Sequence, residues 1–220
     1  MKAVIVAGGA HAPSDQRALD TADMVIAADG GTRWLDTLGR APDRVIGDLD
    51  SSDPALIGRL ADAGVPVERH PTDKDASDLE LSVAAAVEAG ADELVVLGGL
   101  GGDLDHLAAN LLLLGSPLAE GRAMRLALGR TSARMLVGPV RGAVAGPAGT
   151  RVTLLAVGEA AGGITTRGLR WPLEDAHLDP GSSLGLANLV TQPPAEVWVE
   201  VGRVLLIEIE PDPVGGEARP

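Results

Sequence analysis

The 220-residue sequence contains no cysteine, no tyrosine and no phenylalanine. The absence of cysteine excludes a disulfide framework, a thiolate metal site and a cysteine nucleophile. Any stacking platform built from a large aromatic side chain must therefore use one of the three tryptophans, Trp34, Trp171 or Trp198. The longest apolar runs, such as residues 111–114, are far too short to span a bilayer, so no membrane partner is expected.

Positive charge is also scarce, with 18 basic against 31 acidic residues and a net charge of −13. This balance argues against sequence-independent nucleic-acid binding, which needs a basic surface. It still permits a nucleotide ligand, because Mg²⁺ and a few basic side chains can reverse the field inside a pocket. The apolar run at residues 3–7 is short and continues into Gly8-Gly9 instead of a cleavage site, which favours the first buried strand of a cytoplasmic protein.

The order of the predicted elements indicates two domains. From residue 1 to about residue 114, short apolar runs alternate with segments of helical periodicity, which is typical of a mostly parallel sheet with helices on both faces. Asp53 followed by Pro54 predicts one helix start, and Ser77 with Glu80 predicts another. After residue 114 the chain has short strand candidates separated by Gly and Pro. We therefore expect a Rossmann-like α/β/α domain over residues 1–120, a β-sandwich over residues 121–212 and a flexible tail over residues 213–220.

Near the end of the chain, residues 196–201 and 204–209 are strand candidates that flank Gly202-Arg203. A two-residue connection with Gly at its first position is typical of a type II′ β-hairpin. This spacing predicts that both strands lie side by side in one sheet, with Val197, Val199 and Val201 on one face.

The segment at residues 47–53, Gly-Asp-Leu-Asp-Ser-Ser-Asp, follows a short apolar run. In an extended backbone Asp48 and Asp50 would point to the same side, and two such charges repel unless a cation lies between them. Mg²⁺ is the simplest such cation, because it prefers oxygen ligands. A polar turn without any metal remains the alternative for this motif alone.

Further acidic residues lie where the predicted strands end. Segments 29–31, 47–50 and 98–106 each follow a strand, and segment 73–80 opens a helix. Ligands of open α/β sheets bind beyond the carboxyl ends of the strands, so these acids and glycines are expected to converge. Carboxylates that hold Mg²⁺, beside glycine-rich loops that meet phosphate oxygens, suit phosphoryl transfer. The glycine run at 98–102 is not a P-loop, because the Lys-Ser/Thr ending is missing.

Four motifs together resemble one known family. Ala-Asp-Gly-Gly at 28–31, Gly-Asp-Leu-Asp-Ser at 47–51, Lys-Asp-Ala-Ser-Asp-Leu-Glu at 74–80 and Gly-Gly-Leu-Gly-Gly-Asp-Leu-Asp-His at 98–106 occur in the order and spacing of the thiamine pyrophosphokinase family. The resemblance implies transfer of a diphosphoryl group from ATP to the hydroxyl of thiamine, giving thiamine diphosphate and AMP. It also implies a homodimer with its sites between the subunits.

The resemblance assigns roles to particular residues. Asp29, Asp48, Asp50 and Asp75 are the implied catalytic acids, and Asp48, Asp50 and Asp75 are the implied Mg²⁺ ligands. The implied contacts to ATP and thiamine are Gly30, Gly31, Lys74, Asp78, Gly101, Gly102, Asp105, His106, Trp171 and Asn188.

Two positions depart from the family pattern. Asp103 stands where the family usually has arginine, and Ala187 stands where it usually has serine. The first change should weaken nucleotide binding unless Arg17, Arg33 or Arg130 replaces the lost charge. Two other functions therefore stay open: a diphosphokinase of similar scaffold that acts on another alcohol such as a pterin, and a nucleotide- or thiamine-binding module without catalysis.

Overall fold

The computed structural model describes residues 1–212, so the tail expected at 213–220 lies outside the described residues. The chain forms two compact units, Met1–Gly129 and a second unit that begins at Arg130. The observed division falls after the boundary expected at residue 120. The physical reason is that strand β6 (Ala123–Leu128) pairs in parallel with β5 (Glu93–Leu97) and so extends the sheet of the first unit.

The first unit contains a sheet of parallel strands in the order β6-β5-β1-β2-β3-β4. The central strands carry continuous runs of buried Val, Ile, Leu and Ala, as expected for a sheet covered on both faces. The remaining strands are β1 (Lys2–Val6), β2 (Met24–Ala28), β3 (Arg44–Gly47) and β4 (Val67–Arg69).

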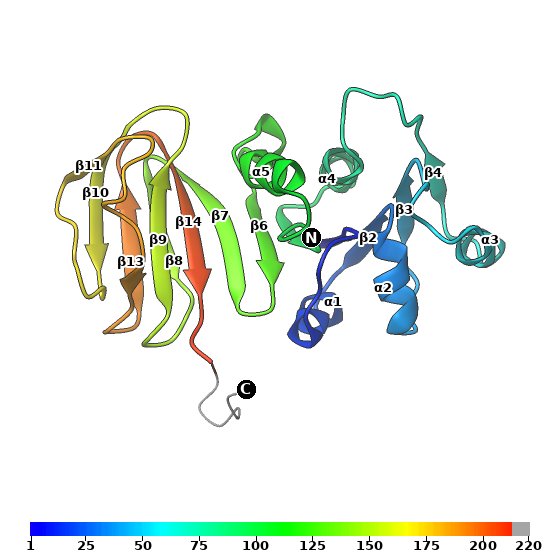
Figure 1. Ribbon diagram of the computed structural model, residues 1–220, viewed down its shortest axis with the longest axis horizontal. Coiled ribbons are helices and arrows are strands. Elements are labelled where there is room, and N and C mark those ends of the chain that lie inside the picture. The colour runs from blue at the N-terminus through cyan, green and yellow to red at the C-terminus, as the bar shows by residue number, and fades with distance from the viewer. Residues whose placement is uncertain (213–220) are drawn as a thin grey trace. The chain divides into compact units, whose positions relative to one another are not determined.

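Helices cover both faces of this sheet, with α1 and α2 on one side and α4 and α5 on the other (Figure 1). The helices are η1 (Pro13–Asp15), α1 (Gln16–Asp20), α2 (Gly31–Thr37), α3 (Pro54–Asp62), α4 (Asp78–Glu88), α5 (Leu104–Leu113) and η2 (Pro117–Ala119). Both predicted helix starts are confirmed: the Asp53 side chain accepts a hydrogen bond from the Ala55 amide, and Ser77 Oγ accepts one from the Glu80 amide. Among the helices within residues 1–212, none combines the length and apolar character that a bilayer crossing requires.

The second unit consists of two antiparallel sheets, β12-β9-β14-β7 and β11-β10-β13-β8. Buried side chains from both sheets form one hydrophobic cluster, which includes Leu154, Leu206, Ile164 and Val197. Each such side chain contributes about 1.5–3 kcal/mol by leaving water. The strands are β7 (Thr131–Val137), β8 (Val140–Val144), β9 (Arg151–Ala156), β10 (Ala161–Arg167), β11 (Ala176–Leu178), β12 (Asn188–Leu189), β13 (Ala195–Val199) and β14 (Arg203–Ile209).

The hairpin expected around Gly202 is wrong. Strand β13 pairs with β8 and β10, whereas β14 pairs with β7 and β9, so the chain changes sheets at this turn. Val197 and Val199 are buried as expected, but Val201, which lies beyond the end of β13, is 62% exposed. The amide of Val201 donates to the Gly162 carbonyl, which holds the connection against β10.

Candidate active site

A cavity of about 630 Å³ opens in the first unit at the carboxyl ends of its parallel strands. It lies beyond β1 and β5, where Ala7, Gly8 and Gly98 contribute to its lining. The strand order reverses between these two neighbours, since β2 to β4 follow on one side of β1 and β5 and β6 on the other. Ligands of open α/β sheets bind at such a reversal, and the sequence-based prediction also puts its ligand at these strand ends.

The floor of this cavity is made of closely packed main chain. A Cβ atom added at Gly9 would overlap the Gly98 carbonyl oxygen, and one added at Gly31 would overlap the Val6 carbonyl oxygen. Of the two adjacent glycines after β2 that were predicted to bind substrate, Gly30 lines the cavity, whereas Gly31 is buried and packs against the end of β1. Positions 9 and 31 require glycine, because a Cβ atom there would overlap the neighbouring main chain.

Three carboxylates converge beside this floor. Oxygen atoms of Asp29, Asp48 and Asp78 all lie within 4.8 Å of one another, and each residue is partly buried. Asp29 follows β2 with φ = 41°, Asp48 follows β3, and Asp78 is the first residue of α4. Asp78 Oδ1 is shielded from solvent. Carboxylate oxygens held this close form a donor set suited to a hard divalent cation.

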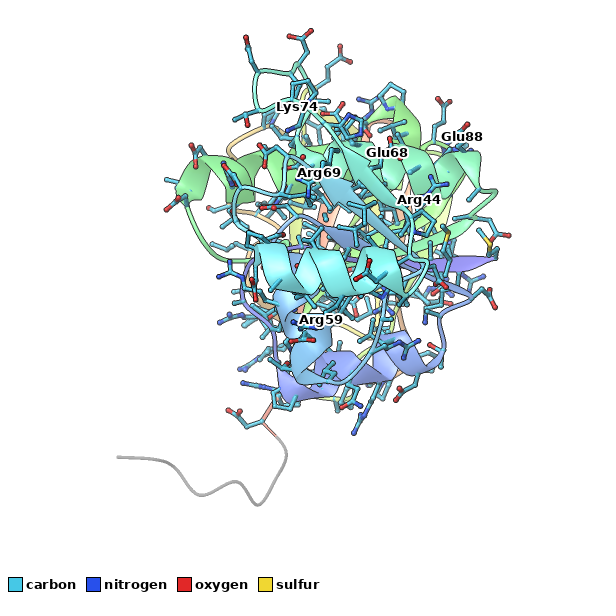
Figure 2. The ribbon with its side chains drawn as sticks, turned by 90° about the vertical axis from the view of Figure 1, so that its right-hand side faces the viewer. Arg44, Arg59, Glu68, Arg69, Lys74 and Glu88 are labelled. Carbon is cyan, nitrogen blue, oxygen red and sulfur yellow. The ribbon has the colours of Figure 1, made fainter. Side chains whose placement is uncertain are left out.

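Lys74 partly neutralises these acids. Its Nζ lies 3.0 Å from Asp78 Oδ1 and 3.6 Å from Asp48 Oδ2, and it reaches them from the connection that leaves β4 beyond Arg69 (Figure 2). Desolvation, the largest single influence, opposes the charged form, but Asp78 and Asp48 together raise the pKa of Lys74. The pKa of Asp48 is lowered, first because its carboxylate accepts the Asp50 amide and then because Lys74 lies nearby. Lys74 and Asp48 are therefore both charged at neutral pH.

Asp50 and Asp75 are not members of this group of three. Asp50 is exposed, and its amide donates to Asp48 Oδ1 over 3.2 Å. The expected extended backbone does not occur, because Leu49 is buried with φ = 65°, which turns Asp50 away from the side that Asp48 faces in a strand. Asp75 lines the same cavity as Lys74.

The glycine-rich loop between β5 and α5 forms another wall. Gly101 and Gly102 line the cavity with φ values of 93° and 79°, which glycine adopts without strain. His106 and Asp103 also line it, and Asp103 occupies the N-cap position of α5 without making a side-chain cap. Asp105 is exposed outside the lining, and its carboxylate accepts the His106 amide at 2.8 Å.

The sequence analysis did not predict two polar residues that lie near the site, Ser52 and Asn110. The buried Ser52 hydroxyl lies 3.1 Å from the Asp29 carbonyl oxygen and 3.3 Å from Asp29 Oδ1, so it holds this acid in place. Asn110 lines the cavity and donates to the Gly99 carbonyl at 3.0 Å. Asn110 comes four residues after His106 on α5, and this helical spacing was the one signal that pointed toward it.

In the second unit, Asn188 fixes the backbone of Trp171. Asn188 Oδ1 accepts the Trp171 amide at 3.1 Å, and Asn188 Nδ2 donates to the Trp171 carbonyl at 2.6 Å. The Trp171 ring is 53% exposed, and the Arg170 guanidinium lies 4.8 Å from its centroid. The buried Asn188 thus uses both ends of its amide internally and presents an accessible aromatic ring.

Family models match both halves of the chain. The thiamin pyrophosphokinase catalytic domain matches residues 16–126, just over half of the sequence, and the thiamin pyrophosphokinase vitamin B1 binding domain matches residues 144–206. The chain belongs to the thiamin pyrophosphokinase family. The four sequence motifs described above therefore lie within a confirmed family, and the cavity lies in the unit that contains the match to the catalytic domain.

Individual members of the thiamin pyrophosphokinase family agree with this assignment. The thiamine pyrophosphokinase of Bacillus subtilis (strain 168) is 27% identical over 187 residues, which are 84% of this chain and 87% of that protein. Thiamine pyrophosphokinase 3 of Oryza sativa subsp. japonica is 27% identical over 204 residues, 80% of this chain and 74% of the relative. The crystal structure of the Geobacillus thermodenitrificans enzyme superimposes with a TM-score of 0.83 at 27% identity, covering 96% of this chain and 99% of that one. The crystal structure of the B. subtilis protein has the same fold, with a TM-score of 0.86 at 24% identity. The superposition covers 96% of this chain and 100% of that one.

Proposed function

We propose that this chain transfers the diphosphoryl group of ATP to the hydroxyl of thiamine, giving thiamine diphosphate and AMP. The observation that carries the proposal is the group Asp29, Asp48 and Asp78 with Lys74, set beside a glycine main-chain floor in a member of this family. Phosphoryl transfer needs positioning and charge neutralisation, and it needs no protein nucleophile.

The three converging carboxylates fit Mg²⁺. All of their donor atoms are oxygens, and the buried Asp78 Oδ1 already lies 3.0 Å from one cation, the Lys74 ammonium. We therefore propose Asp29, Asp48 and Asp78 as the residues that hold the ion. When bound, the ion neutralises charge on the phosphate oxygens. The sequence predicted Asp50 and Asp75 as ligands beside Asp48; both lie outside the converging group, so our proposal assigns the ion to the other three acids.

The chain's own groups support an in-line displacement. The thiamine hydroxyl oxygen forms a bond to the β-phosphorus, while the bond from that phosphorus to the AMP oxygen breaks and AMP keeps the electron pair. Asp29 accepts the hydroxyl proton, and Ser52 orients its carboxylate. Lys74 balances the charge of Asp48 and Asp78, and the glycine segments with Gly30, Gly101 and Gly102 admit the phosphates close to the main chain.

We further propose that the second unit is a β-sandwich that binds thiamine and that the first is a Rossmann-like nucleotide-binding unit. The exposed Trp171 ring offers a stacking surface for the pyrimidine of thiamine. Asn188 then acts as a positioning residue, because its side-chain amide hydrogen-bonds both backbone groups of Trp171.

A homodimer is part of the proposal. Helix α5 has no buried residue within Leu104–Leu113 in the single chain, and Leu104 and Leu112 are 80% and 61% exposed. The same helix contributes His106 and Asn110 to the cavity. A second copy that covers these leucines would remove apolar surface from water beside the site. The cytoplasmic location expected from the sequence stays a prediction.

Product analysis tests the reaction. The purified protein is incubated with ATP, Mg²⁺ and thiamine, and we expect AMP and thiamine diphosphate in equal amounts. Asp48→Ala should abolish both products, whereas Asp62→Ala at the exposed end of α3 should not. ADP in place of AMP would contradict diphosphoryl transfer. Turnover of a pterin alcohol in place of thiamine would favour the other diphosphokinase function, and thiamine binding without turnover would favour a binding module.

A further inference from the structure

The charge inside the cavity of the first unit is unusual for a site that takes a polyphosphate. Four carboxylates line or border it, from Asp29, Asp75, Asp78 and Asp103. A nucleotide triphosphate is itself strongly anionic, so it is repelled unless cations compensate. Bound Mg²⁺ offsets part of this charge, and the rest must come from basic side chains in the lining.

Lys74 cannot supply all of this compensation. Its ammonium group already contacts two carboxylates, at 3.0 Å in Asp78 and 3.6 Å in Asp48. These contacts fix its position deep beside the acids, where 15% of its side chain remains exposed. Lys74 therefore mainly neutralises protein charge.

Arg33 is the arginine among the lining residues, and it lies on the first turn of α2. Its guanidinium folds over Gly30, with Nη2 3.3 Å from where a Cβ atom of that glycine would lie. Within residues 1–212 no carboxylate forms an ion pair with Arg33, and Asp36 on the same helix pairs with Arg59 instead. The N–H groups of Arg33 are thus available at the wall of the cavity.

We propose that Arg33 binds the phosphate chain of the nucleotide and sets the affinity of this site for ATP. This inference rests on the proposed diphosphoryl transfer. A guanidinium presents parallel N–H groups that match two phosphate oxygens, and it keeps its charge at every relevant pH. Because Asp103 adds a negative charge to the same cavity, the free Arg33 is the group that turns the local field in favour of an anion.

Steady-state kinetics with varied ATP and saturating thiamine test the assignment. We expect Arg33→Gln to raise KM for ATP by about 10- to 100-fold, because a charged hydrogen-bonding pair is lost. KM for thiamine should change less than twofold. Arg33→Lys keeps the charge without the paired N–H groups and should fall between wild type and Arg33→Gln. Arg17→Ala, an exposed arginine on α1 outside the lining, is the matched control and should behave as wild type.

Direct ATP binding and its salt dependence distinguish a phosphate contact of Arg33 from a merely structural role. Added KCl should weaken ATP binding, measured by calorimetry, more steeply in the wild type than in Arg33→Gln. Equal ATP affinity and equal salt dependence in both proteins would overturn the proposal. If the wild type forms no AMP, the proposed reaction fails, yet the ATP titration still decides whether Arg33 contacts the nucleotide.

Discussion

Replacing Asp78 by Asn tests which acids bind the metal ion. The structure groups Asp78 with Asp29 and Asp48, whereas the sequence analysis predicted Asp48, Asp50 and Asp75. In the metal-free protein, charges 4.8 Å apart repel by about 3.5 kcal/mol at an effective dielectric constant of about 20, so Asp78→Asn removes repulsion from Asp29 and Asp48. The same change removes the attraction of Lys74, at 3.0 Å from Asp78. Because these contributions oppose each other, we expect the free energy of unfolding to change by about 1 kcal/mol or less.

Metal affinity should respond far more strongly. Residues that merely support a ligand typically change metal affinity by about 10- to 100-fold, so losing the ligand Asp78 should cost at least about 100-fold. That factor corresponds to about 2.8 kcal/mol. Mn²⁺ prefers the same oxygen ligands and its unbound fraction is measured by electron paramagnetic resonance, with Mg²⁺ as competitor.

Asp75→Asn is the matched control for this measurement. Asp75 lines the same cavity three residues before Asp78, but it is outside the group of converging carboxylates. We expect it to keep Mn²⁺ affinity within about threefold of wild type, in contrast to Asp78→Asn. Unchanged affinity in Asp78→Asn, or an equal loss in Asp75→Asn, would refute the assignment drawn from the structure.

Three further predictions concern the scaffold around the two sites. Asn188→Ala leaves two backbone groups of Trp171 without partners, so we expect the free energy of unfolding in urea to fall by about 2–3 kcal/mol and KM for thiamine to rise. Gly31→Ala would place its Cβ against the Val6 carbonyl oxygen, and we expect a melting temperature lowered by more than about 8 °C or no cooperative transition. The lowered pKa of Asp48 stabilises the fold fully above its unfolded value of about 3.9, and this contribution is lost as the pH falls through the lower folded value. The difference in unfolding free energy between wild type and Asp48→Asn should therefore be constant near neutral pH and change only in acid.

Matched variants make these three outcomes decisive. Gly58→Ala in α3 adds a Cβ that meets nothing within 4 Å, so it should leave the melting temperature unchanged or raise it slightly. If Gly31→Ala melts like Gly58→Ala, the close main-chain packing is wrong. Asn188→Asp keeps the acceptor for the Trp171 amide and should lose less stability than Asn188→Ala. A pH-independent difference for Asp48→Asn down to about pH 2 would contradict a charged Asp48 that titrates in acid.

Local signals predicted much of the first unit. The buried strands of Val, Ile and Leu and the helix starts at Asp53 and Ser77 follow from short-range rules, because the residues that decide them are adjacent in the sequence. The convergence of acids at the strand ends also follows, since parallel strands end at one edge of the sheet. The family motifs added the identity of the reaction.

The partners within the acidic group could not be predicted in the same way. The i, i+2 spacing predicted that Asp48 and Asp50 point to the same side, because an extended backbone was expected there. Leu49 is instead buried with a positive φ, so the backbone is not extended at this point. Which acids meet is then decided by where β2 ends and where α4 begins, which brings Asp29 and Asp78 to Asp48. Such a meeting depends on packing between segments far apart in the chain, and no short spacing encodes it.

The predicted β-hairpin at Gly202 is wrong for a related reason. A two-residue connection fits a hairpin by local rules, but the two flanking strands each complete a different sheet of the second unit. Burial of both strands in a shared core outweighs the preference of the turn, because several buried Val and Leu side chains contribute more than one turn conformation.

The glycine floor of the cavity has a consequence for how this protein can change over evolutionary time. Because Gly9 and Gly31 touch neighbouring main chain, almost any replacement there disturbs the sheet before it alters recognition. Heritable variation in how tightly the phosphate chain is held must therefore accumulate on the rim, at positions such as Arg33 and Asp103, where side chains are exposed. A substitution there alters the affinity of the site and leaves the sheet intact, whereas a substitution in the floor threatens the fold first.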